Sequence, residues 1–353
     1  MKKTYINGVG CISTQKTFNT VFLEEAVYNQ KDTVFTLVKP EYKEYVSPAA
    51  SRRMAKGVKN GIVASALAMK DSNTEKVDAI ITGTGMGCIE DSDRFLKNIL
   101  DNNEEFLTPT SFIQSTHNTV GAQIALLMQC KGYNFTYVNG VVSFESAILD
   151  AKMQIEEEEA SSILVGGIDE NTDYTMSLYK LAGFVKNDQE TPFDVLKETS
   201  TGVVYGEGAS FFVLENERKE STYAQILDIE IVNTLEENEV EAEILAFLKA
   251  NNLQIADIDA VVLGFNGDAH FDSYYKNLAQ NTFVQTPQLY YKHLSGEYNT
   301  SSAFGLWMAS KVIQTQEIPN IIKVNSVEKP AYNTILLYNQ YKGKNHSLTL
   351  LSK

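Results

Sequence analysis

A helix–strand unit that occurs twice along the chain constrains the fold more than any other feature. In the first half, GVKNGIVASALAM at 57–69 places apolar residues at helical spacing, and the strand VDAIIT from Val77 runs into a glycine turn. In the second half, VEAEILAFLKANN has the helical pattern, and IDAVVLG from Ile258 repeats the strand. Both strands continue from Asp-Ala through two β-branched residues to a glycine. This alternation predicts an α/β protein.

The similarity between the halves extends downstream. FTYVNGVVSFESAILDAKM and LYYKHLSGEYNTSSAFGLWMASKV both offer a short strand, a turn and a helix start rich in small residues. Each half ends in an apolar strand, GASFFVLE from Gly208 and HSLTLLSK at the C-terminus. Any α/β chain repeats helices and strands, but the shared order favours an internal duplication. We expect halves at 1–220 and 221–353 in one compact unit, with the charged segment Glu215–Val240 as the seam.

The charge balance excludes several classes of partner. The chain has 353 residues and a formal net charge of −15, with 45 acidic and 30 basic side chains. Phosphate contacts need a basic surface, so a nucleic-acid binder is excluded, and so is a polybasic membrane-surface protein. No stretch approaches the roughly 20 apolar residues of a membrane helix. The N-terminus reads as a first strand without the apolar core of a signal peptide, and we expect a cytoplasmic protein.

Neither a metal nor a cofactor is expected. The cysteines Cys11, Cys88 and Cys130 are odd in number and widely spaced, which fits neither a disulfide framework nor a zinc site, and we expect small buried side chains. The run EEEE at 156–159 reads as a solvated helix end, because consecutive carboxylates on a helix point in different directions. GTGMG and VGG lack the spacing of a nucleotide-binding loop.

Six segments in order resemble the β-ketoacyl synthases of the thiolase fold. They are YINGVGCIST, SRRMAKGVKNGIVASALAMKDS, GTGMGCIED, SILVGGIDE, TPFD and TGVVYGEGASFFVLE. The resemblance covers nearly the whole chain, and Gly-Glu-Gly-Ala in the last segment is its most specific match. It implies two duplicated α/β halves in an αβαβα layered arrangement. It also implies a nucleophilic cysteine at a helix N-terminus, where the helix dipole favours the thiolate, and two histidines with a supporting lysine in the second half.

The catalytic positions of that family are changed in this chain. Counting back from Gly166 places Val141 where the resemblance implies the cysteine, and a valine cannot be acylated. The first histidine position falls on Asn266. In KHLSGE the lysine is kept as Lys292, while the second histidine becomes Glu297. Val141, Asn266 and Glu297 cannot perform Claisen condensation, and Glu297 would also repel a developing enolate. We expect a structural Lys292–Glu297 ion pair instead.

The remaining histidines and one tyrosine complete the candidates. The resemblance places Tyr341 at the aromatic gate of the acyl pocket. His117 precedes a helix in a segment that resembles the part of the family reaching the dimer partner, so we expect a capping or dimer-contact residue. His270 and His293 lie close to family positions but out of register, and His346 is expected at the surface.

The cysteine and both histidines are lost together while the scaffold motifs are kept. In this combination the chain resembles the chain length factors. Those cysteine-less homologues pair with an active ketosynthase and shape the tunnel that limits product length. We therefore expect a heterodimer in polyketide, aryl-polyene or fatty-acid-like biosynthesis, and trimming around residues 215–255 favours the aryl-polyene or flexirubin-like branch. An acidic acyl carrier protein would dock mainly on the partner, with Arg52, Arg53, Lys56 and Lys59 leaving room for a minor contact.

Two other functions stay open at this stage. One is an acyltransferase or hydrolase with altered chemistry that uses Ser143, His293 or Glu297. The other is a homodimeric acyl-binding scaffold without a synthase partner.

Overall fold

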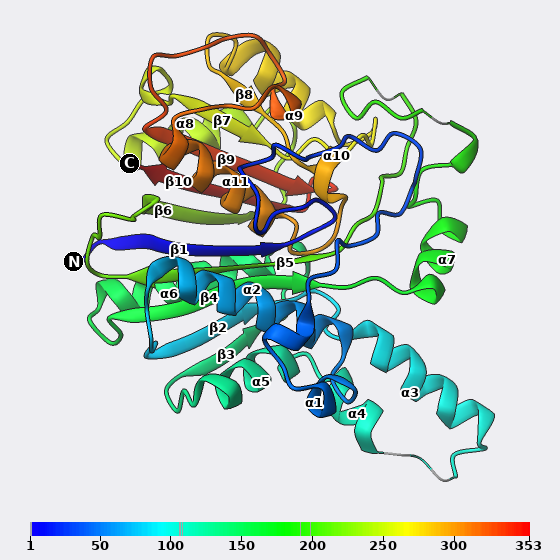
Figure 1. Cartoon of the computed structure of the whole chain (residues 1–353). Coiled ribbons are helices and arrows are strands. Elements are labelled where there is room, and N and C mark those ends of the chain that lie inside the picture. The colour runs from blue at the N-terminus through cyan, green and yellow to red at the C-terminus, as the bar shows by residue number, and fades with distance from the viewer. Residues whose placement is uncertain (1, 106, 108, 191, 198) are drawn as a thin grey trace.

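The computed structural model describes residues 2–105, 107, 109–190, 192–197 and 199–353 (Figure 1). Its strands form one mixed ten-stranded sheet. Those of the first half are β1 (Thr4–Ile12), β2 (Ala79–Gly83), β3 (Asn134–Tyr137), β4 (Ser162–Asp169) and β5 (Gly208–Glu215). Those of the second half are β6 (Ala224–Asn233), β7 (Ala260–Leu263), β8 (Gln288–Leu289), β9 (Thr334–Tyr341) and β10 (Asn345–Ser352).

The strand order repeats between the halves as a mirror image. The sheet reads β3-β2-β4-β5-β1-β6-β10-β9-β7-β8, so adding five to each number of the first half reproduces the second half in reverse. The sense of pairing repeats too, with β2 parallel to β3 and β4 as β7 is to β8 and β9. This repetition confirms the internal duplication. Antiparallel pairing of β1 with β6 joins the halves into one continuous sheet. We propose the boundary at 220/221, in the connection that precedes β6.

Helices cover both faces of the sheet. The outer helices of the first half are α2 (Lys56–Ser72) and α5 (Thr119–Met128), and those of the second half are α8 (Val240–Ala250) and α9 (Ser273–Asn277). The central helices are α6 (Ser143–Glu156) and α11 (Ser302–Thr315). The others are α1 (Pro48–Ser51), α3 (Ile89–Asp101), α4 (Pro109–Ser115), α7 (Asp173–Leu181) and α10 (Lys292–Ser295). Since α6 and α11 lie between strands of both halves, the layering is the expected αβαβα arrangement of the thiolase fold.

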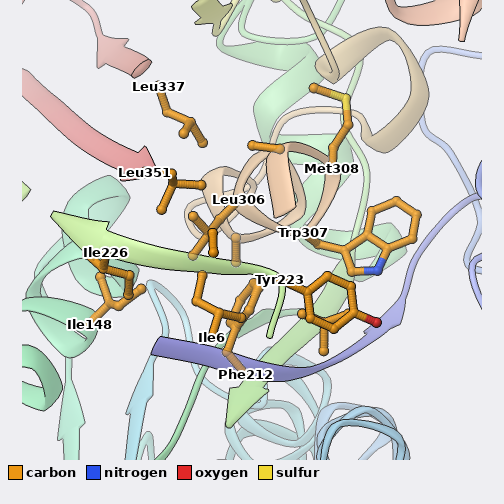
Figure 2. Packing of buried hydrophobic residues seen from close by; sticks show 14 of the residues in the cluster. Ile6, Ile148, Phe212, Tyr223, Ile226, Leu306, Trp307, Met308, Leu337 and Leu351 are labelled. Atoms are coloured by element: carbon orange, nitrogen blue, oxygen red, sulfur yellow. The ribbon is translucent and has the colours of Figure 1, made fainter. Parts of the chain in front are cut away.

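Three hydrophobic clusters hold these layers together. The largest packs α6 and α11 against strands of both halves, and Figure 2 shows Ile148 of α6 and Leu306 of α11 in this core. A second cluster joins α2 and α5 to the outer face of the first-half strands, and a third joins α8 to that of the second half. The small residues at the start of α11 let it pack closely, because Ala303, Gly305 and Ala309 are all buried.

The segment Glu215–Val240, which we expect to be the seam between the halves, contains β6, the strand that pairs with both β1 and β10. One expectation about the second half is wrong. His346 is not at the surface but buried in β10. Its Nε2 accepts from the Leu235 backbone N–H at 3.3 Å, and its Nδ1 lies 2.9 Å from the Tyr338 hydroxyl. Burial lowers its pKa, so the imidazole is a neutral part of the core.

Candidate functional site

Val141 lies at the start of the central helix of the first half. It sits in the 3-10 turn Gly140–Val142, which leads directly into α6, and Gly140 has a φ of +54° that favours glycine. The side chain is 7% exposed and lines a small cavity. A cysteine here would meet the N-terminal end of a 14-residue helix, where the dipole favours a thiolate. Valine offers no nucleophile and no hydrogen-bonding atom at this place.

Asn266, Lys292 and Glu297 form one hydrogen-bonded network. Glu297 Oε2 accepts from Lys292 Nζ at 2.8 Å and from Asn266 Nδ2 at 2.7 Å. Its Oε1 accepts from Ser301 Oγ at 3.1 Å. The predicted Lys292–Glu297 ion pair is therefore confirmed. Gly296, with a φ of +70°, ends α10 and turns the chain so that Glu297 faces back to Lys292.

This network is buried, and its two charges neutralise each other inside the protein. The Lys292 and Glu297 side chains are 1% and 5% exposed, and each charge has its partner within the protein. A buried pair of this kind is stable when the remaining lone pairs are hydrogen-bonded, as the Asn266 and Ser301 contacts provide. The Lys292 ammonium and the Glu297 carboxylate are thus paired with each other, so neither group is available to polarise a substrate carbonyl.

Asp272 holds the turn that carries Asn266. Its carboxylate accepts from the backbone N–H of Gly267 at 2.8 Å and of Asn266 at 3.2 Å. Burial raises the pKa of Asp272 to about 7, and these two backbone hydrogen bonds oppose the rise. Asp272 was not among the site residues expected from the sequence. An acidic residue six positions after the altered histidine position, directly before α9, was the available signal.

Tyr341 separates two hollows. The inner cavity, of about 40 Å³, is lined by Val141, Glu297, Tyr205 and Tyr341 among others. An outer hollow of about 320 Å³ also has Tyr205 and Tyr341 in its wall, together with Asn266. About 10–15 Å³ admits one water molecule, so the inner cavity has room for about three and not for an acyl chain. Burial raises the pKa of Tyr341 to about 12 and keeps the phenol neutral.

Two consecutive acidic residues at the end of β4 complete the site. Asp169 accepts from the backbone N–H groups of Gly85 and Met86 at 2.9 and 3.1 Å and from both the backbone and the hydroxyl of Thr300 at 2.9 Å. It therefore ties the glycine turn of the first half to the start of α11. In SILVGGIDE, neither acid was among the site residues expected from the sequence; two consecutive acids at the end of a buried strand were the available signal.

Glu170 faces the other way and serves two helix N-termini. Its carboxylate accepts from the Gly57 N–H at the start of α2 and from the Glu90 N–H at the start of α3, the latter at 3.0 Å. These N–H groups have no partner within their own helices, and helix dipoles favour a negative charge there. Burial nevertheless dominates and raises the pKa of Glu170 to about 7.

The remaining candidates lie outside the network. His117 is exposed, and the N-cap of α5 is Asn118, so the capping expectation is wrong. His270 is exposed at the outer hollow. His293 is buried, stacks on Tyr290 at 3.7 Å between ring centroids, and has its pKa lowered to about 3 by burial.

The cysteines and the possible metal ligands complete the account. Cys11 and Cys88 are buried as expected, whereas Cys130 is half-buried. Within the described part of the chain, no three His, Cys, Asp or Glu side chains are grouped to hold a metal ion. Among the same residues, no helix combines the length and apolarity required to cross a bilayer.

Comparison with known proteins identifies the family. The β-ketoacyl synthase N-terminal domain matches residues 25–220, more than half of the chain. The chain therefore belongs to the β-ketoacyl synthase family. No curated protein sequence matches it.

Solved structures show the same fold over the whole chain. The ishigamide ketosynthase/chain length factor aligns with a TM-score of 0.78 and 18% identity, covering 100% of this chain and 99% of that one. A β-ketoacyl synthase from Burkholderia phymatum aligns at 0.76 and 15%, covering 100% of both. A ketosynthase (ApeO) in complex with its chain length factor (ApeC) from Xenorhabdus doucetiae aligns at 0.75 and 14%, covering 99% and 98%.

Proposed function

We propose that this chain is the non-catalytic subunit of a ketosynthase pair and acts as chain length factor for an active ketosynthase. The product class is polyketide or aryl-polyene. The observation that carries the proposal is the closed Asn266–Lys292–Glu297 network beside Val141. It occupies the place where the resemblance implies two histidines and a cysteine. A site with no nucleophile and no free general base cannot form or condense an acyl-enzyme.

The exposed edge of the sheet at β3 is the second argument for a partner chain. β3 is a terminal strand of the sheet, and Asn134 and Phe135 in it are exposed. Exposed apolar side chains surround that edge on α5, α6, β3 and the two residues that flank β3; they are Leu126, Leu127, Tyr133, Phe135, Val138 and Met153. An open edge strand with an apolar border is a template for pairing with another chain. At the opposite end of the sheet, both residues of β8 are buried.

His117 belongs to the same proposal. It is exposed just before α5, and α4 next to it exposes Phe112 and Ile113 at 54% and 56%. We infer that this segment contacts the ketosynthase and contributes to the wall of its product tunnel. The carrier protein docks mainly on that partner, because the charge of −15 on this chain repels an acidic protein.

The hydrolase or acyltransferase alternative has little structural support. Ser143 is fully buried, and its hydroxyl donates to the Gly140 carbonyl at 2.6 Å and accepts from the Asn139 N–H at 2.8 Å. His293 Nε2 lies 2.8 Å from the Ile321 carbonyl and its Nδ1 has no hydrogen-bond partner among the described residues, so neither ring nitrogen is paired with a serine. The acyl-binding scaffold alternative needs room for a chain. The inner cavity of about 40 Å³ does not offer it, so the chain would have to occupy the outer hollow of about 320 Å³.

Co-expression with a cysteine-containing ketosynthase and a carrier protein, which we expect to be encoded beside this chain, tests the proposal. We expect the two synthase-fold chains to co-purify and to make product together, with neither active alone. Phe135→Lys places a charge on the sheet edge and should weaken co-purification about tenfold, since 1.4 kcal/mol corresponds to that factor. Leu245→Lys is the control, because Leu245 is 45% exposed, as Phe135 is 46%, but lies on α8. Equal binding by both variants, or no co-purification at all, would refute the pairing.

A further inference from the structure

A closed ring of side-chain contacts surrounds the wall between the two hollows. Tyr205 and Tyr341 line both the inner cavity and the outer hollow, and their side chains hydrogen-bond to each other. Tyr205 packs on Tyr179, with ring centroids 5.3 Å apart, and Tyr179 packs on Phe184 at 5.8 Å. The Lys342 ammonium closes the ring, because it lies 3.7 Å from the centre of the Phe184 ring and 5.2 Å from that of Tyr341.

The two sides of this ring come from different halves of the duplication. Tyr205, in the first half, is held by its backbone, whose N–H donates to the Thr33 carbonyl at 2.9 Å and whose carbonyl accepts from the Phe35 N–H at 2.8 Å. Tyr341, in the second half, is the last residue of β9 and begins the turn into β10. The contact between the two tyrosines therefore depends on how that turn is held against the first half.

The turn itself does not favour a lysine at position 342. The Lys344 N–H donates to the Tyr341 carbonyl at 3.1 Å and closes the turn, and the two central residues, Lys342 and Gly343, have φ values of +53° and +63°. Two positive φ values characterise the type I′ turn, in which Asn or Gly is preferred at the first central position. A contact made by the ammonium group accounts for the lysine better than the backbone does.

The position of the Lys342 ammonium supplies such a contact. A cation within about 6 Å of an aromatic ring centre is attracted to the face of the ring, and the attraction is stronger where water is partly excluded. Lys342 is half-buried and meets this distance at both Phe184 and Tyr341. We propose that Lys342 acts as a latch, which holds Tyr341 against Tyr205 and keeps the inner cavity closed toward the outer hollow.

The latch changes what the aromatic gate does in this chain. The resemblance implies a gate at Tyr341, and the Lys342–Phe184 contact holds that gate shut. The outer hollow of about 320 Å³ then ends at the two tyrosines and does not continue to Val141. This inference concerns the isolated chain and stands whether or not it pairs with a ketosynthase.

The rate at which a thiol at position 141 is labelled measures the latch. In Val141→Cys the introduced thiol faces the inner cavity, whose volume of about 40 Å³ is too small for N-ethylmaleimide unless the wall opens. Lys342→Met removes the charge and keeps the length, so we expect it to accelerate labelling about fivefold, which corresponds to about 1 kcal/mol. Lys342→Arg keeps the cation and should label as slowly as the parent. Peptide mass spectrometry separates the introduced thiol from the three native cysteines.

Two further variants decide between a latch and a general effect of charge. Lys344→Met is the matched control, because Lys344 is exposed in the same turn and its loss changes the net charge equally; its labelling rate should stay at that of the parent. Phe184→Leu removes the ring under the ammonium and should accelerate labelling as Lys342→Met does. Equal rates in all variants, or equal acceleration by Lys344→Met, would overturn the latch. Every measurement uses this chain alone, so failed pairing with a ketosynthase leaves the result unaffected.

Discussion

Removal of one member of the buried Lys292–Glu297 pair should destabilise the protein far more than removal of both. At 2.8 Å and an effective dielectric constant of about 20, the attraction between the two charges is about 6 kcal/mol. Most of this offsets the desolvation of two side chains that are 1% and 5% exposed. A single substitution therefore leaves an uncompensated buried charge, at a cost of about 3–5 kcal/mol.

Glu297→Gln is the informative change because its amide oxygen can still accept from Asn266, while its amide nitrogen can donate to the Ser301 hydroxyl. It removes only the negative charge and leaves Lys292 unpaired. Lys292→Met likewise removes the positive charge while keeping a similar length. The double variant removes both charges, and we expect it to lie within about 1 kcal/mol of the wild type.

The assay is urea unfolding of the wild type, both single variants and the double variant. Trp307 is the only tryptophan, is 3% exposed and packs in the central core, so its fluorescence reports the unfolding of that core (Figure 2). The coupling between the two substitutions should be at least about 3 kcal/mol. If Glu297→Gln costs less than 1 kcal/mol, or if the two effects simply add, the network is not the self-contained unit described above.

Two further predictions concern Glu170 and Val141. Burial raises the folded pKa of Glu170 from 4.5 to about 7, so the folded carboxyl binds its proton more tightly than the unfolded one. Its contribution to stability is greatest below pH 4.5 and falls by about 3 kcal/mol as the pH rises through 7. The difference in unfolding free energy between wild type and Glu170→Gln should therefore shift against the wild type across that window; a pH-independent difference contradicts this assignment. Val141→Cys should react with iodoacetamide yet leave decarboxylation and condensation of malonyl carrier protein at background, because Asn266 and Glu297 supply no imidazole. Turnover by that variant would show that the second-half positions are not the cause of inactivity.

The strands that carry a repeated apolar pattern could be predicted from the sequence. β2 and β7 both follow an Asp-Ala start, and their equivalence in the sheet agrees with that pattern. β6 could not be predicted in the same way. Only Ala224, Ile226 and Ile229 of its ten residues are buried. The polar residues in the strand therefore make its pattern hard to distinguish from the charged segment around it. Its place is set by pairing with β1 and β10, which no local pattern encodes.

The candidate site likewise contains one contact that the local sequence predicts and others that it does not. Lys292 and Glu297 are five residues apart, so their pairing follows from one short helix and a glycine turn. Asn266 joins them from 31 residues away, and that contact depends on how β7 and α10 meet. His346 also looked like an exposed residue near a terminus, but the pairing of β9 with β10 buries it. Long-range packing, and not local composition, decides the positions of Asn266 and His346.

The position of β1 has a consequence for synthesis of the chain. Tyr5 pairs with Glu215 on one side and with Gln225 on the other, so β1 is synthesised well before either neighbour and yet lies in the middle of the finished sheet. At about 5–20 residues per second, its neighbours follow roughly 10–40 s later. Throughout that interval, the apolar residues of β1 have no strand to pair with. Slowed translation before residue 226 should therefore expose this chain to aggregation, and a chaperone that holds the N-terminal strand should raise the yield.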